Sequence, residues 1–378
     1  MLFGNQAGNG NSGETDLFDV NTYTGGTIVS RSSSVLTRTA TTGANGPVGN
    51  GGALDVFGQI RFYSGATLRN FAGTANQYTV NLHPGGVLWF DNEGGIQNRY
   101  DDTTPLDLNG GQLYLRAENN AATTTTEIIG AVGFSRGSSL RVDRRITNGA
   151  VQLTAASLTR AGVGSTLAIV TNGAFLGLNA GVDEVERIKV TAWDTTLPTL
   201  SGNVNRNVTP GFANNGILPA YYIDATSNTF LSYNSTTGFQ SVLSTLTPAT
   251  NQVAYSNIFA GGVFSVNTTG SSVVDVTTAA VTLLQDQTVY ALRTSQNISS
   301  GFAQFNTLTF ADGATDADRG GLLINNLGAD NTSVTLATNL KFGTSGNKEG
   351  IIYFQNPGGT NRTATISGDI SASSITKF

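Results

Sequence analysis

Apolar and polar residues alternate with a period of two along most of this chain. Two clear examples are LDLNGGQLYL and VNLHPGGVLWF, in which the alternating apolar residues are Leu106, Leu108, Leu113, Leu115 and Val80, Leu82, Val87, Trp89. Shorter examples lie at 151–153, 167–169, 273–276, 308–310, 334–336 and 351–354. Strict alternation is typical of half-buried strands, and no window sustains apolar residues at helical spacing. The sequence therefore predicts an all-β protein.

The turns between these segments decide between two β architectures. Each segment ends in Gly, Asn, Asp or Pro, which supply the backbone angles that turns need. The NGG and PGG sequences could close hairpins, as in a pair of β-sandwiches. Strand-like segments return every ~8–12 residues, however, with longer self-similarity at roughly 20–25 residues, which is typical of a solenoid. We therefore predict a right-handed parallel β-helix with about 22 residues per coil.

Domain boundaries are faint, because charge and composition change little along the chain. The least repetitive part is 197–245, which contains Pro198, Pro210 and Pro219. We predict a β-helix region over 1–196, an irregular side lobe or insertion over 197–250, and a second β-helix region over 251–378 that continues the first.

Composition narrows the class of protein. Hydrophobic residues make up 39% of the 378 residues and the net charge is only −5, whereas disorder normally combines low hydrophobicity with high net charge. No cluster of Lys and Arg is present, so we expect no nucleic-acid partner. No apolar run approaches the roughly 18–20 residues of a membrane span, so no transmembrane segment is expected. The start, MLFGNQAGNGNSG, does not have the pattern of a signal peptide.

Acidic residues are the first candidates for chemistry, because glycoside cleavage uses two carboxylates about 5–9 Å apart. The candidate sets are Asp91 with Glu93, Asp101 with Asp102, and Asp183, Glu184 and Glu186. Asp91 and Glu93 share a face if they lie on one strand, but acidic residues are also common in solvated turns. We expect the single histidine, His83, to flank a turn at the surface, because a general base would need a partner that the sequence does not show. Cysteine is absent, which excludes Cys–His catalysis.

Two further groups concern ligands rather than catalysis. Asp312, Asp316 and Asp318 in ADGATDADRGG are the best metal candidates, since oxygen ligands from a Gly-rich loop suit Ca²⁺. A solvated turn is the alternative, and no other cofactor is expected. The aromatic group Tyr221, Tyr222, Phe230 and Tyr233 either contacts a ligand such as a sugar or forms the small core of its own lobe.

Several segments resemble the autotransporter-associated β-strand repeat proteins, a family of large bacterial surface proteins. The segments are NTYTGGT at 21–27, NRYDDTTPLDLNGG at 98–111 and LTAASLTR at 153–160. The resemblance covers most of residues 15–240. Over 251–378 it lies mainly in the general pattern of residue types. It implies an exported parallel β-helix used for surface display, adhesion or matrix building, and it supplies no catalytic residues.

The order of two motifs suggests self-association. In the family that the chain resembles, a segment like TISGDI followed by SITK stands shortly before an NTYTGGT segment, whereas here the first lies near the end and the second near the start. Joining tail to head would restore the family order. We therefore expect a structural, non-enzymatic extracellular protein of a bacterial fibre or matrix filament that stacks head to tail. The alternatives are an adhesin that binds glycans and a β-helical polysaccharide lyase or hydrolase.

Overall fold

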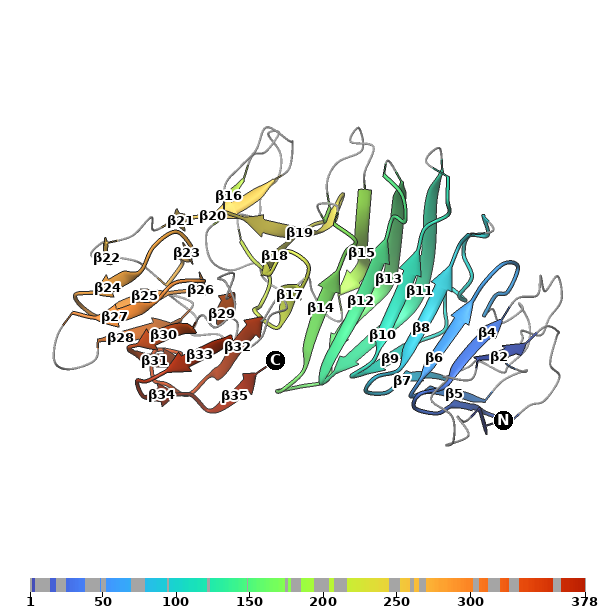
Figure 1. Cartoon of the computed structure of the whole chain (residues 1–378), viewed down its shortest axis with the longest axis horizontal. Helices are drawn as coiled ribbons and strands as arrows, with labels where there is room; N and C mark the ends of the chain where they lie inside the picture. The colour runs from blue at the N-terminus through green and yellow to red at the C-terminus, as the bar shows by residue number, and fades with distance from the viewer. Residues whose placement is uncertain are drawn as a thin grey trace. The chain divides into compact units, whose positions relative to one another are not determined.

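The computed structural model (Figure 1) describes residues 2–3, 14–17, 25–37, 48, 52–68, 79–93, 95–120, 123–147, 149–173, 176–177, 185–193, 204–206, 216–244, 252–258, 262–264, 270–301, 306–311, 320–325, 333–355 and 362–377. These residues form strands and turns without any helix, which confirms the all-β prediction. Accordingly, the described part of the chain has no apolar helix of membrane-spanning length. Two compact units are present, unit 1 (Met1–Leu197 with Asn234–Phe239) and unit 2 (Pro198–Tyr233 with Gln240–Phe378).

Unit 1 consists of two parallel sheets that receive strands alternately from the chain. One sheet contains, in spatial order, β1 (Leu2–Phe3), β3 (Thr27–Val29), β5 (Ala53–Val56), β7 (Thr79–Leu82), β9 (Leu106–Asn109), β11 (Thr124–Ser135), β13 (Ala150–Arg160) and β15 (Val185–Trp193). The other contains β2 (Glu14–Leu17), β4 (Ser34–Thr37), β6 (Gln59–Phe62), β8 (Val87–Asp91), β10 (Gln112–Arg116), β12 (Gly137–Asp143) and β14 (Thr166–Val170). Figure 1 shows these strands side by side from blue to green. Odd- and even-numbered strands thus alternate between the sheets, so one strand from each makes a coil.

The register in unit 1 confirms a parallel β-solenoid and excludes the sandwich alternative. Val56 pairs with Leu82, Leu82 with Leu108 and Leu108 with Phe134, so each step advances the chain by 26 residues. The coil is therefore longer than the predicted value of about 22 residues. The difference arises because the corners, which carry no alternating signal, take up more of the chain than the pattern of apolar residues indicates.

The inward rows of unit 1 are apolar, with one correction to the expected pattern. Leu113 and Leu115 are fully buried, as the alternation predicts. In the VLWF segment, however, the buried residues are Leu88 and Phe90, whereas Val87 and Trp89 are only partly buried and lie on the outer face. The sequence analysis names Val87 and Trp89 as the alternating apolar residues, but an unbroken apolar run does not show which alternate set points inward. The register decides it, since Leu88 pairs with Leu113.

The Gly-Gly sequences form corners of the coil. In the PGG segment Gly85 has φ +86°, a left-handed conformation that residues with a Cβ rarely adopt. The next residue, Gly86, lies so close to the preceding coil that a Cβ would overlap the carbonyl oxygen of Val56. The first glycine therefore supplies the turn, and the second allows close approach of successive coils.

Unit 2 contains a solenoid with three parallel sheets. They comprise, in spatial order, β21 (Asn257–Ile258), β23 (Val273–Val276), β26 (Ala291–Thr294), β29 (Gly321–Asn325), β32 (Glu349–Gln355) and β35 (Ser374–Lys377); β22 (Gly262–Phe264), β24 (Val281–Leu283), β27 (Ile298–Ser300), β30 (Ser333–Ala337) and β33 (Thr363–Ile366); and β25 (Gln287–Val289), β28 (Thr307–Phe310), β31 (Asn339–Phe342) and β34 (Ile370–Ser371). Their inward residues form one apolar core, in which the rings of Phe310 and Phe342 stack with centroids 4.8 Å apart.

A further group of strands precedes this solenoid in the chain. They are β16 (Val204–Arg206), β17 (Tyr222–Asp224), β18 (Thr229–Asn234), β19 (Gly238–Leu243) and β20 (Val253–Tyr255). β17 pairs with β18 and β16 with β20 in antiparallel fashion, unlike the strands of the solenoid. Apart from β20, these strands lie within 197–245, the part of the sequence that shows the least repetition.

Candidate functional site: a stacked polar face

A network of polar contacts lies on the outer face of β6, β8, β10, β12 and β14 in unit 1. Because residues two apart on a strand point to the same side, this face carries two neighbouring rows of side chains. The register aligns Arg61, Trp89, Tyr114 and Arg141 in one row, and Asp91, Arg116 and Asp143 in the other. We call these residues, together with Glu93, Arg144, Arg145, Asn172 and Glu186 around them, the stacked face.

The first row is a continuous stack of cations and rings. The guanidinium carbon of Arg61 lies 4.2 Å from the centroid of the Trp89 ring. Trp89 and Tyr114 stack with centroids 5.0 Å apart and an interplanar angle of 16°. Arg141 covers the Tyr114 ring from the far side, with its guanidinium carbon 4.4 Å from the centroid. Both faces of this aromatic pair are therefore occupied by protein groups, and cation–π attraction joins four successive coils.

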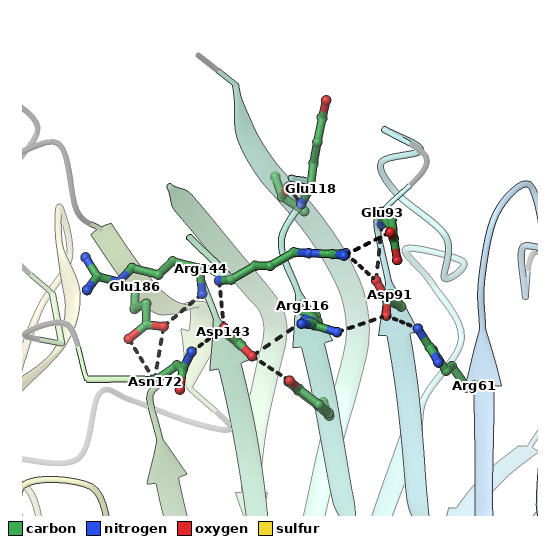
Figure 2. A network of polar contacts seen from close by, with 12 residues as sticks. Arg61, Asp91, Glu93, Arg116, Glu118, Asp143, Arg144, Asn172 and Glu186 are labelled. Atoms are coloured by element: carbon green, nitrogen blue, oxygen red, sulfur yellow. Dashed lines mark hydrogen bonds and ion pairs between the residues drawn. The ribbon is translucent and has the colours of Figure 1, made fainter. Parts of the chain in front are cut away.

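Asp91 is the centre of the second row. Its side chain is fully buried, and its oxygens lie 2.5 Å from Nη2 of Arg61, 3.5 Å from Nη1 of Arg116 and 3.4 Å from Nη1 of Arg145. The backbone N–H of Glu93 also donates to Asp91 at 3.2 Å. Figure 2 shows Arg61 and Arg116 approaching Asp91 from opposite sides. Asp91 therefore joins the coil of β8 to the coils of β6 and β10.

Asp143 continues the row one coil further. It accepts hydrogen bonds from the Tyr114 hydroxyl at 2.6 Å, from Nδ2 of Asn172 at 2.8 Å and from the backbone N–H of Arg145 at 2.6 Å. Nε of Arg116 lies 3.8 Å away, so Arg116 bridges Asp91 and Asp143 (Figure 2). Burial, followed by the hydrogen bond to Asp143, raises the pKa of Tyr114, so the hydroxyl remains a donor.

Glu186 closes the network on the neighbouring sheet. Its side chain is fully buried on β15 and accepts the backbone N–H groups of Arg144 at 2.9 Å and of Asn172 at 3.0 Å and 3.1 Å (Figure 2). These contacts tie the corners after β12 and β14 to the opposite sheet. The carboxylate of Glu186 therefore stabilises backbone turns of two adjacent coils.

The side-chain contacts of the stacked face hold successive coils together. A general acid for glycoside cleavage needs a raised pKa, whereas the hydrogen bond from Arg145 lowers the pKa of Glu93. Arg145 lies 3.0 Å from Glu93 and also contacts Asp91, so it holds the two candidate carboxylates together as an ion cluster. Within the described residues, no group of three His, Cys, Asp or Glu side chains is arranged to hold a metal ion.

Of the other candidate acids, the structure describes Asp101 and Asp102. Asp101 accepts both the N–H and the hydroxyl of Thr103, which is the geometry of a turn, and Asp102 is exposed beside it. Asp183 and Glu184 lie outside the described residues, as do the predicted calcium ligands Asp312, Asp316 and Asp318. The calcium assignment therefore stays a prediction.

His83 has a partner that its own segment does not reveal. Its Nε2 lies 3.0 Å from Oδ1 of Asp55, one coil earlier, and its ring stacks on Phe57 with centroids 4.0 Å apart. Nδ2 of Asn81 donates to the same oxygen of Asp55. The contacts of His83 therefore run along the axis, as those of the stacked face do.

The aromatic candidates lie near β17 and β18. Tyr222, Phe230 and Tyr233 are 2%, 1% and 4% exposed, and Tyr221 is partly buried against Tyr222, with ring centroids 4.7 Å apart. In this structure the three buried rings belong to a local core, and the proposed contact with a ligand stays a prediction.

Sequence reasoning misses most of the stacked face. Of its residues, it singles out only Asp91, Glu93 and Glu186, each as a candidate catalytic acid. The available signal is positional, because Arg61, Trp89, Tyr114 and Arg141 recur at intervals of 28, 25 and 27 residues. If the sequence is written with one coil per line, these four residues fall close to one column.

No protein-family model, curated protein or solved structure matches this chain.

Proposed function

We propose that this chain is a non-enzymatic structural protein, a β-solenoid unit of a bacterial extracellular fibre or matrix filament that stacks head to tail. The observation that carries the proposal is that polar and aromatic groups of the stacked face find their partners one coil away. Asp91 binds Arg61 and Arg116 from the two adjacent coils, and Trp89 stacks on Tyr114. The side-chain chemistry of this face is thus used for cohesion along the axis.

Backbone hydrogen bonds also join successive coils along the axis. Parallel strands join every coil of unit 1 to the next, and the same holds for the three sheets of unit 2. Each sheet places its hydrogen bonds along the axis, so load on a filament would be carried by many bonds at once. Low charge, 12% of residues, also limits repulsion between neighbouring filaments.

The resemblance to the autotransporter-associated β-strand repeat proteins supports export and a structural role. The catalytic alternative receives no support from the stacked face, because Asp91 is enclosed by arginines and the pKa of Glu93 is lowered. The stacked face does not support the glycan-binding alternative either. Arg61 covers the ring of Trp89 and Arg141 covers the ring of Tyr114, so neither outer ring face is open to a sugar.

Electron microscopy of the purified full chain, without denaturation or proteolysis, tests the proposal. We expect filaments whose number and length grow with protein concentration. Isolated particles at all concentrations would refute head-to-tail stacking. The search would then move to glycan binding and to release of reducing ends or unsaturated products from polysaccharides.

A further inference from the structure

The hairpin between β17 and β18 lies against the outer face of β29 and β32 in unit 2. Ile324 and Phe354 pack in the core of the solenoid, so the next residues of these strands, Asn325 and Gln355, point outward. Asn325 and Gln355 are register partners on adjacent coils. Nε2 of Gln355 donates to the carbonyl oxygen of Ala225, in the hairpin, at 3.3 Å. The turn of the hairpin and the ends of the two strands therefore meet.

Three buried side-chain oxygens at this meeting point have no hydrogen-bond donor in the described chain. They are Oδ1 of Asn228 in the same turn, Oδ1 of Asn325 and Oε1 of Gln355. The side chains of Asn228 and Asn325 are almost fully enclosed, with 7% and 2% exposed. Leaving a buried acceptor without a donor costs free energy, and native structures rarely do so. Three such oxygens in one turn and two strand ends indicate that a bound group supplies the missing partner.

A buried carboxylate without a counter-cation lies in the same turn. Asp224 is fully buried. It accepts hydrogen bonds from the N–H groups of Thr226 and Ser227 and from the hydroxyl of Ser241, and no Lys or Arg of the described chain pairs with it. Burial raises the pKa of Tyr353, and the charge of Asp224 raises it further, so this carboxylate also acts on the outer face of β32. Buried charges are normally paired or bound to a metal.

The chemistry of these groups favours a cation over water. A buried water could donate hydrogen bonds to the three amide oxygens, but it would leave the carboxylate of Asp224 without a positive partner. Oδ2 of Asp224 accepts a single hydrogen bond, from Ser241, and so keeps capacity for a further contact. Zn²⁺ and Cu²⁺ favour His and Cys ligands, whereas Ca²⁺ takes carboxylate, amide and backbone oxygens in irregular arrangements.

We propose that the turn at 224–229, together with Asn325 and Gln355, binds Ca²⁺. The amide oxygens of Asn228, Asn325 and Gln355 and one oxygen of Asp224 are the protein ligands, and water completes the coordination. The ion joins the hairpin to two successive coils of the solenoid, so calcium stabilises unit 2. The site does not depend on filament assembly.

Thermal unfolding of the full chain, freed of metals with a chelator, tests the proposal. The background is D312N/D316N/D318N, which removes the acidic loop in which the sequence predicts calcium. In this background about 10 mM Ca²⁺ should raise the unfolding midpoint by roughly 5 °C, as for a dissociation constant of about 0.1–1 mM. Adding N228G/N325L should abolish the rise. Glycine keeps the left-handed conformation of Asn228, φ +52°, and leucine replaces an amide oxygen that has no donor.

Terbium luminescence locates the site. Tb³⁺ occupies calcium sites and emits when a tyrosine beside it absorbs light. We expect emission that Ca²⁺ competes away and that Tyr353→Phe weakens. The matched control is Asn98→Gly, because Asn98 is also left-handed and has an unpaired Oδ1 but lies in unit 1. It should leave the emission and the calcium response unchanged.

Absence of any calcium response in the background variant would overturn the proposal and leave the three oxygens to buried water. An equal response with and without N228G/N325L would refute this site and place calcium elsewhere. If circular dichroism shows that the variant with N228G/N325L does not fold, Asn325→Asp decides. The added carboxylate should tighten calcium binding severalfold, and an unchanged affinity would contradict the assignment.

Discussion

The guanidinium of Arg61 and the carboxylate of Asp91 lie 2.5 Å apart, although 30 residues separate them in the chain. Arg61 is on β6 and Asp91 on β8, so the pair joins two successive coils. Because Asp91 is fully buried while Arg61 is 24% exposed, the ion pair lies at the base of the stacked face. This arrangement makes Asp91 the residue on which the polar contacts of three coils depend.

Asp91→Asn should destabilise unit 1 strongly. The change keeps the volume of the side chain but removes the buried carboxylate that Arg61, Arg116 and Arg145 share. Removing one partner of a buried ion pair typically costs about 3 kcal/mol of the free energy of unfolding, and we expect a loss of that order. Urea unfolding followed by circular dichroism measures it.

The control for this change is Asp102→Asn, which alters an exposed residue in a turn. We expect the control to stay within about 0.5 kcal/mol of the unchanged protein. Equal unfolding midpoints for the two variants would show that the Asp91 cluster adds nothing to the cohesion of the coils.

Tyr114→Phe removes the hydroxyl that donates to Asp143 at 2.6 Å but keeps the ring that stacks on Trp89. Hydrogen bonds to charged groups contribute about 1.5–3 kcal/mol, and we expect a loss near the lower value because Asn172 and Arg116 also contact Asp143. A double-mutant cycle with Asp143→Asn isolates the contact. Losses that simply add in the double variant would contradict a direct coupling between the two groups.

Gly86→Ala tests the close approach of two coils at a corner. The added Cβ would overlap the backbone carbonyl of Val56, which is held in a strand and cannot move aside as a side chain could. We expect a loss of about 3 kcal/mol, as for overpacking at a rigid site. Gly25→Ala is the matched control, because no atom lies within 4 Å of the position that its Cβ would take. Thermal unfolding of both variants gives the comparison, and similar midpoints would refute the role of Gly86.

The features that the sequence predicts correctly are local ones. Alternation in LDLNGGQLYL places Leu113 and Leu115 inside, and the Gly-Gly pairs mark corners, because both effects are determined within a few residues. Repetition of these local signals along the chain is what indicates a solenoid. The parallel β-solenoid is therefore predictable from the amino-acid sequence alone.

The stacked face is not predictable in the same way. Trp89 points outward because Leu88 pairs with Leu113 in the next coil, and a shift of one residue in that register would exchange the two faces. Contacts such as Arg61 with Asp91 depend on the length of each coil, which varies as corners lengthen or shorten. Alternation alone carries no information on that length, so it does not reveal the partners of charged residues.

Asp224 should make the stability of unit 2 depend on pH. Its side chain is fully buried and accepts hydrogen bonds from Ser241 Oγ at 2.5 Å and from the backbone N–H groups of Thr226 and Ser227. Burial raises the pKa of Asp224 above its ordinary value of 3.8, more than these hydrogen bonds lower it. The folded state therefore binds the proton more tightly than the unfolded state does.

The sign of the effect follows from this difference in proton affinity. The contribution of Asp224 to stability is fully present below about pH 4 and is lost as pH rises through the raised pKa of the folded state. Asp224→Asn, which stays neutral, should lose less stability than the unchanged protein over the same rise in pH. Urea midpoints measured from about pH 4 to about pH 8 test this, with the exposed Asp369→Asn as the control that should follow the unchanged profile. Parallel profiles for the unchanged protein and Asp224→Asn would show that Asp224 does not titrate with a raised pKa, and its hydrogen bonds would then outweigh its burial.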